Sequence, residues 1–136
     1  MKKILHTGLL AVLFSGILFY SGCDDTTNTA ELDNIVIPAS NVSYRRHIQP
    51  VFDLKCNNAG CHNDADRAGG LALTSHQNTT SNFDIVFPGE PNNSLLIQSI
   101  RGLSLYPMPP LNYYPLTKNQ IEGITTWVRE GAKDNP

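Results

Sequence analysis

The chain has 136 residues, a length that predicts one small domain. Its formal net charge is −2, from 10 Lys and Arg against 12 Asp and Glu. A protein held to nucleic acid by phosphate contacts needs a strongly basic surface, so this charge argues against a nucleic-acid partner.

The first 22 residues are predicted to be a lipoprotein signal peptide rather than part of the fold. Lys2 and Lys3 form a basic start, and an almost wholly apolar stretch follows from residue 4 to residue 20. Small residues then precede Cys23, as at sites where bacterial lipoproteins are cleaved and the new N-terminal cysteine is lipidated. We therefore expect a lipid anchor on Cys23 and a place in the cell envelope, facing the periplasm or the cell exterior. A short uncleaved membrane anchor is the alternative.

The rest of the chain is expected to form a tether and one domain. Residues 23–43 are polar and show little helical periodicity, which predicts a flexible tether. Residues 44–136 carry the apolar periodicity and are predicted to be the domain. Its middle, residues 63–93, is rich in loop-forming residues, so the apolar core is thin for a domain of about 90 residues. A buried apolar cofactor would enlarge that core.

The first helix of the domain is predicted from about residue 44 onward. Four apolar residues fall on one helical face, at i, i+4, i+7 and i+8: Tyr44, Ile48, Val51 and Phe52. Pro50 is expected to start or kink this helix, because proline fits the first turn and not the interior. The helix then brings Cys56 to its C-terminal end.

The segment CNNAGCH, residues 56–62, is typical of c-type haem attachment. Each thiol adds to a vinyl group of the porphyrin, and the histidine directly after the second cysteine ligates the iron. Four residues separate the cysteines instead of the usual two, and we expect them to loop out where Gly60 turns the chain. The predicted attachment points of one covalent haem c are Cys56 and Cys61, with His62 as the proximal ligand.

A second, shorter helix is predicted over residues 94–101. Leu96, Ile97 and Ile100 share one face of this segment. Gly102 is expected to end the helix, because glycine readily adopts the left-handed conformation found after helix C-termini.

The segment YPMPP, residues 106–110, supplies a second candidate iron ligand. The chain has two methionines, and export would remove Met1 and leave Met108. A thioether is a soft donor suited to haem iron, and the flanking prolines restrict the backbone around it. We predict Met108 as the distal ligand. His47 and His76 are the alternative ligands, and filling a core gap is the alternative role for Met108.

The last helix has the strongest local signals. Thr117 and Gln120 form a predicted capping box, and Leu116 and Ile121 a predicted hydrophobic staple. Gly131 is expected to end the helix. The buried stripe is predicted to contain Ile121, Ile124, Thr125 and Val128.

The chain resembles the single-haem cytochrome c domains of exported bacterial proteins, including planctomycete-type domains and their Bacteroidetes relatives. The matching segments occur in the family's order: HIQPVFDLKCNNAGCHN, GGLALTS, VFPGEPNNSLLIQSI, YPMPP and ITTWVREGA. The resemblance implies an all-α, class I-like fold of about three helices whose long loops wrap around one haem. It also implies haem attachment at Cys56 and Cys61, with His62 and Met108 as axial iron ligands.

The leading hypothesis for function is an electron carrier and not an enzyme. Two protein ligands would fill both axial positions of the iron, so the haem would pass one electron at a time to a redox partner protein. Such partners bind weakly and transiently, and a lipid anchor would raise their effective concentration at the membrane.

Two other classes of function stay open at this point. In one, Met108 is a labile ligand, and the haem reacts with a small ligand or peroxide or acts as a sensor. In the other, the chain is an exported module without haem. Its cysteines Cys56 and Cys61 would then form a disulfide, or bind zinc together with His62 and His47.

Overall fold

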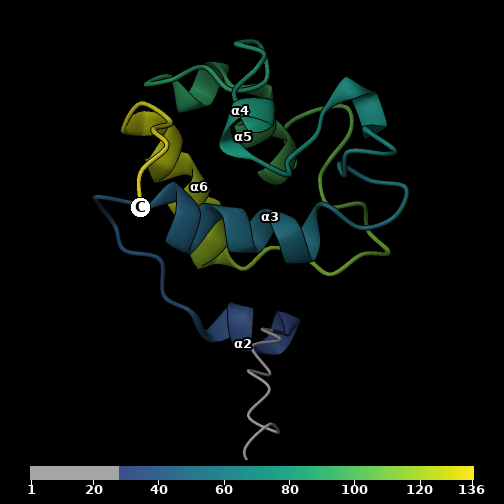
Figure 1. Cartoon of the computed structure of the whole chain (residues 1–136), viewed down its shortest axis with the longest axis horizontal. Coiled ribbons are helices and arrows are strands. Elements are labelled where there is room, and N and C mark those ends of the chain that lie inside the picture. Colours follow the sequence, from purple (N-terminus) through teal and green to yellow (C-terminus); the bar gives the residue numbers. More distant parts are fainter. Residues whose placement is uncertain (1–27) are drawn as a thin grey trace, which may run out of the picture.

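The structure, a computed structural model, describes residues 28–136. The predicted signal peptide, residues 1–22, and the lipidation site Cys23 lie outside the described residues. This part of the chain is helical and contains no β-strand, so the predicted all-α class is confirmed (Figure 1). Its α-helices are α2 (Thr29–Asn34), α3 (Gln49–Lys55), α4 (His76–Thr79), α5 (Leu95–Ile100) and α6 (Lys118–Arg129). Single turns of other helix types are η1 (Tyr44–Ile48, a π-helix), η2 (Ala68–Gly70) and η3 (Pro91–Asn93).

The first predicted helix is present as η1 followed directly by α3. Pro50 lies in the first turn of α3, where its missing N–H costs no hydrogen bond. The change from π-helix to α-helix occurs just before it. Cys56 caps the C-terminal end of α3, and its N–H donates to the carbonyl of Phe52 at 2.9 Å. The four residues of the predicted face are all buried: Tyr44, Ile48, Val51 and Phe52.

The last predicted helix is α6, and its capping box is formed as expected. The Thr117 hydroxyl accepts from the N–H of Gln120 at 3.2 Å, and the Gln120 side chain accepts from the N–H of Thr117 at 2.9 Å. The helix packs against η1, where the rings of Trp127 and Tyr44 lie 5.2 Å apart between centroids. These two large buried aromatic side chains fix the crossing of η1 and α6.

The helix predicted over residues 94–101 is α5, and Leu96, Ile97 and Ile100 are buried as expected. Gly102 follows with φ +71°, the left-handed conformation that ends the helix. Within residues 28–136, no helix has both the length and the apolar character needed to cross a bilayer.

Residues 28–43, here called the N-terminal segment, fall within the stretch predicted to be a tether, yet they pack as part of the fold. Asn28 and Glu31 form a capping box that starts α2. Three apolar side chains of this segment enter the hydrophobic core: Leu32, Ile37 and Val42. The burial of these side chains holds the N-terminal segment on the domain.

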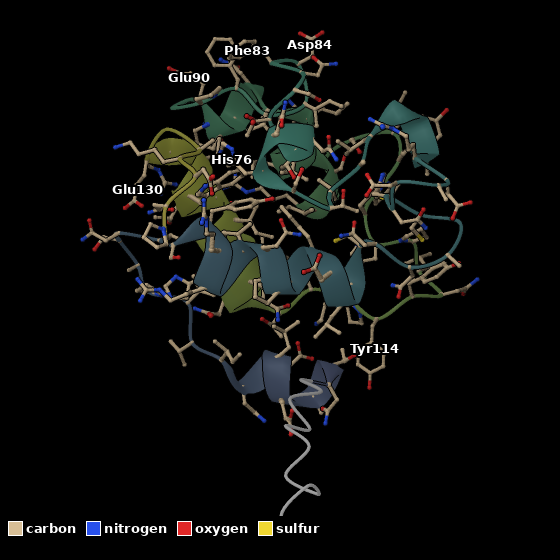
Figure 2. The ribbon with its side chains drawn as sticks, in the orientation of Figure 1. His76, Phe83, Asp84, Glu90, Tyr114 and Glu130 are labelled. Atoms are coloured by element: carbon tan, nitrogen blue, oxygen red, sulfur yellow. The ribbon has the colours of Figure 1, made fainter. Side chains whose placement is uncertain are left out.

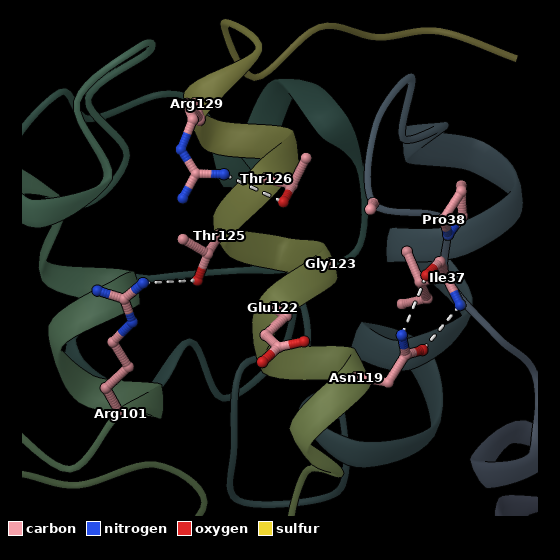
Figure 3. A pocket seen from close by; sticks show the side chains of 10 residues that line it. Ile37, Pro38, Arg101, Asn119, Glu122, Gly123, Thr125, Thr126 and Arg129 are labelled. Carbon is pink, nitrogen blue, oxygen red and sulfur yellow. Dashed lines mark hydrogen bonds between the residues drawn. The ribbon is translucent and has the colours of Figure 1, made fainter.

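Polar contacts add to this packing at both ends of α6. The Asn119 side chain exchanges two hydrogen bonds with the backbone of Ile37, at 2.7 and 3.0 Å (Figure 3). The Glu130 carboxylate accepts from the N–H groups of Asn41 and Val42 at 2.6 and 2.9 Å. The N-terminal segment is thus bound along most of the length of α6.

Gly123 permits the closest approach between the N-terminal segment and α6. A Cβ atom at this position would lie 2.5 Å from Cγ2 and 2.9 Å from Cβ of Ile37. The Cβ atom of Ile37 is fixed by the backbone, so it cannot move away without shifting the N-terminal segment. A glycine in the middle of α6 is therefore explained by Ile37, which lies across from it in Figure 3.

Replacing Gly123 with alanine tests this packing. Helix propensity alone would make Gly123→Ala stabilising by about 1 kcal/mol, whereas overpacking against Ile37 is expected to destabilise by about 1–3 kcal/mol. Urea unfolding followed by circular dichroism measures the free energy of unfolding and shows which effect is larger. Adding Ile37→Ala as a second substitution should reduce the penalty of Gly123→Ala, and a single variant more stable than the parent would contradict the packing.

Candidate haem site

The loop that follows α3 brings His62 back to Cys56. The N–H of His62 donates to the carbonyl of Cys56 at 3.0 Å, and the N–H of Cys61 donates to the carbonyl of Asn58 at 2.9 Å. Gly60 lies between them with φ +79°, a conformation that glycine adopts without steric cost. The four residues between the cysteines are therefore looped out, as expected from the sequence.

Hydrogen bonds of Asp66 and Asn63, here called the brace, hold this loop closed. The sequence analysis did not identify them. The Asp66 carboxylate accepts from the N–H of Gly60 at 2.6 Å and from the Asn63 side chain at 2.7 Å. Asn63 also donates to the carbonyl of Asn58 at 3.0 Å. The hydrogen bond from Asn63, followed by that from Gly60, holds the pKa of Asp66 below its usual value.

The two cysteines are free thiols, so the disulfide of the non-haem hypothesis is not formed. Cys56 packs against the hydrophobic core, and burial is the main reason that the pKa of its thiol is raised to about 12. At neutral pH this thiol is protonated. Among residues 28–136, no group of three or more His, Cys, Asp or Glu side chains is placed to hold a metal ion. The structure therefore offers no support for the zinc hypothesis.

Two buried polar atoms in this loop have no hydrogen-bond partner within the described part of the chain: Nδ1 of His62 and Oδ1 of Asn57. Leaving such an atom unsatisfied costs about 1–3 kcal/mol. The backbone of His62 is nevertheless fixed, because its carbonyl accepts from the N–H of Leu73 at 2.8 Å. A fixed histidine with an unsatisfied ring, beside two free thiols, fits the binding of a cofactor here.

Met108 lies in the long loop between α5 and α6, here called the Met108 loop, residues 102–117. Its N–H donates to the carbonyl of Ser99 at 2.9 Å, and its side chain packs partly buried against the hydrophobic core. Cys56 packs against the same core. The loop after α3 and the Met108 loop lie at the same end of the molecule, on the right in Figure 1. The structure thus brings the two halves of the predicted site to one region.

Lys55, directly before Cys56, connects these two loops and was not singled out by the sequence analysis. Its side chain has no exposed surface, and Nζ donates to the carbonyl of Pro115 at 2.8 Å. Nζ also donates to Asp33 of α2 at 2.5 Å and to Gln120 of α6 at 3.1 Å. The hydrogen bond from Lys55 is the main reason that the pKa of Asp33 is lowered.

The Met108 loop exposes an unusual amount of apolar surface. It carries no charged residue, and Leu105 and Leu111 are almost completely exposed, at 92% and 104%. The other large exposed residues of this loop are Leu103, Tyr106, Tyr113 and Tyr114. Exposed apolar side chains gathered in one loop are typical of a surface that a ligand or a partner covers.

The two alternative histidine ligands are engaged elsewhere. Nδ1 of His47 accepts from the N–H of Ser43 at 3.0 Å, and burial with the nearby Arg46 charge lowers the pKa of His47. His76 donates from Nε2 to the carbonyl of Ala132 at 2.7 Å and packs edge-on against Trp127, beside α6 (Figure 2). Met108 has no competing hydrogen-bonding role, so it is better suited to ligation than either histidine.

A cavity of about 260 Å³ lies over α6, away from these residues (Figure 3). Its lining includes Ile37 of the N-terminal segment and Arg101, which donates to Thr125 at 3.4 Å. None of the predicted haem residues lines this cavity. The cavity therefore has no part in the candidate site.

Asp66→Asn tests the brace of the loop after α3 through pH. The folded pKa of Asp66 lies below its unfolded value of 3.8, so its stabilising effect is complete above about pH 5 and is lost as pH falls through the folded pKa. Asp66→Asn should lower the thermal midpoint at neutral pH, and this loss should shrink as pH falls below the unfolded pKa of 3.8. Asp84→Asn, at an exposed aspartate outside the loop, is the control. An equal loss of stability at both pH values would contradict the brace.

Comparison with known proteins gives one family match. The family described as Planctomycete cytochrome C matches residues 59–112, less than half of the chain. The matched residues include Cys61, His62 and Met108 and begin after Cys56. No curated protein and no solved structure matches the chain. The family match supports a cytochrome c-type domain in this protein.

Proposed function

We propose that this protein is an exported c-type cytochrome with a single haem that carries single electrons. Cys56 and Cys61 would hold the haem by thioether bonds, and His62 and Met108 would be its axial ligands. The observation that supports the proposal is the position of the two loops at one end of the molecule (Figure 1). Met108 and Cys56 pack against one hydrophobic core, and the unsatisfied ring of His62 lies in the same loop as the free thiols.

When bound, the haem supplies an iron that changes between the ferric and ferrous states. The residues of this chain then decide what that iron does. His62 and Met108 would both ligate the iron and so keep substrates away from it. A methionine thioether in place of a second histidine raises the reduction potential. The two thioether bonds would prevent loss of the cofactor outside the cytoplasm.

The proposed partners are redox proteins of the cell envelope. The Met108 loop offers an uncharged apolar surface with exposed Leu and Tyr side chains. Redox proteins dock through small interfaces, and the resulting short-lived complexes suit repeated electron exchange. A lipid on Cys23 would keep the protein at a membrane and raise the local concentration of partners there.

The first test is the absorption spectrum of protein made in a host that matures c-type haem. We expect haem that stays with the chain after acid–acetone extraction, and the weak long-wavelength band of methionine–iron(III) ligation. Met108→Ala should abolish this band and lower the reduction potential, because a soft ligand that favours the ferrous state is lost.

Two matched variants make this test specific. His76→Gln should keep the band, because His76 is hydrogen-bonded to Ala132, and His47→Gln should also keep it. A parent protein without covalent haem would overturn the proposal. Covalent haem with a band unaffected by Met108→Ala would overturn the assignment of Met108.

The proposed anchor is tested by fractionation of cells that express the full chain. Parent protein should sediment with membranes and release only in detergent, whereas Cys23→Ser should no longer carry lipid. Metabolic labelling with a fatty-acid analogue measures the modification directly. Labelling of Cys23→Ser at the parent level would exclude Cys23 as the lipidated residue.

A further inference from the structure

We propose that Lys55 is a positioning residue for the haem site, and that Asp33 of the N-terminal segment supplies its counter-charge. The inference rests on the proposed function. Lys55 joins the end of α3, which carries the attachment cysteine, to the end of the loop that carries the distal methionine. Through this contact the N-terminal segment would influence iron ligation by Met108, although it contributes no ligand.

The first support is the complete enclosure of the Lys55 ammonium. A buried charge is tolerated only when it is paired and hydrogen-bonded. All three donor positions of Nζ have a partner, the carbonyl of Pro115, the carboxylate of Asp33 and the amide of Gln120. The three partners come from three different parts of the chain. Moving any one of them away would leave a buried donor unsatisfied.

The second support is the way in which the Met108 loop is attached at its middle and near its end. In its middle, the N–H of Met108 donates to the carbonyl of Ser99 of α5 at 2.9 Å. Near its end, the carbonyl of Pro115 accepts from Lys55 at 2.8 Å, and the ring of Tyr114 lies 5.9 Å from the Lys55 ammonium. The residues between these two attachments are largely exposed. Lys55 thus holds the backbone at Pro115 close to the C-terminal end of α3, next to Cys56.

The third support is the position of Asp33. Its carboxylate accepts from Lys55 at 2.5 Å and from the side-chain amide of Gln120 at 3.0 Å. The Asp33 side chain is 28% exposed, whereas that of Lys55 is fully buried. Solvent can therefore stabilise Asp33 but not Lys55 if the pair separates. Losing Asp33 would leave the lysine charge without compensation, and the lysine would then withdraw from Pro115.

If Lys55 only filled space in the core, its positive charge would not be required. Buried ion pairs are often replaceable by apolar residues of similar size at no loss of stability. What an apolar residue cannot do is hold a particular backbone carbonyl in place. Lys55→Met keeps the length and most of the apolar stem of the side chain, so this variant separates positioning from packing.

The experiment uses the full-length protein with its haem and the variants Lys55→Met and Asp33→Asn. The exposed ion pair of Arg45 and Asp134, 2.9 Å apart, supplies the control variant Asp134→Asn. Each protein is titrated with urea while the methionine–iron(III) band and the helical circular dichroism are followed together. The reduction potential is measured on the same samples.

We expect covalent haem in all variants, because both cysteines are retained. In Lys55→Met and Asp33→Asn the band should disappear at a lower urea concentration than the helical signal, and the reduction potential should fall in both. In the parent and in Asp134→Asn the band and the helical signal should be lost together.

Two results would overturn the inference. One is a band and a potential that match the parent in both folded variants. The other is an intact band with potentials that shift in opposite directions, which shows an electrostatic effect without positioning. Should Lys55→Met fail to fold, Asp33→Asn decides alone, because it keeps the size of the side chain. A parent protein without covalent haem would overturn the proposed function itself, and this inference with it.

Discussion

The buried ammonium of Lys55 is the contact on which the arrangement of the described chain most depends. Removing a charge from water is costly, and the cost is offset only when every donor has a well-placed acceptor. Here the acceptors belong to Asp33, Pro115 and Gln120, which lie in α2, the Met108 loop and α6. The requirement to satisfy one cation therefore fixes four segments relative to one another. Hydrophobic contacts alone are non-directional and would allow these segments to slide.

In this small domain the apolar core fixes the helices, whereas polar contacts determine the shape of the loop after α3. Trp127 and Tyr44 fix the crossing of the first and last helices, at the end of the molecule away from the cysteines. The loop after α3 has little core of its own, and hydrogen bonds to Asp66 and Asn63 define its shape instead. The atoms that stay unsatisfied belong to this loop and not to the helix crossing. A packed core beside a loop whose buried polar atoms lack hydrogen-bond partners is the arrangement expected of a site that receives a cofactor.

Helix caps and apolar helix faces depend on neighbouring residues and could be predicted from the sequence. Hydrogen bonds between residues far apart in the chain could not. The capping box at Thr117 and the apolar face of α3 are local patterns, and both are present. The burial of Lys55 had a local signal, because it follows Ile48, Val51 and Phe52 at the helical spacing i+7, i+4 and i+3. Its partners lie 22, 60 and 65 residues away, however, and no local pattern specifies them. Helix α2 was overlooked because six residues are too few to show periodicity, although its capping box is visible in the sequence.

If Cys23 carries the proposed lipid, the start of α2 at Thr29 limits where the domain can lie above the bilayer. Only a few residues would then separate the bilayer surface from the packed chain. Fully extended, they span about 20 Å, less than the diameter of the domain itself. The domain would then keep its α2 edge toward the lipid headgroups and could not turn over freely. Electron exchange would be confined to a thin layer above the bilayer, and a partner would have to present its own redox centre at that height.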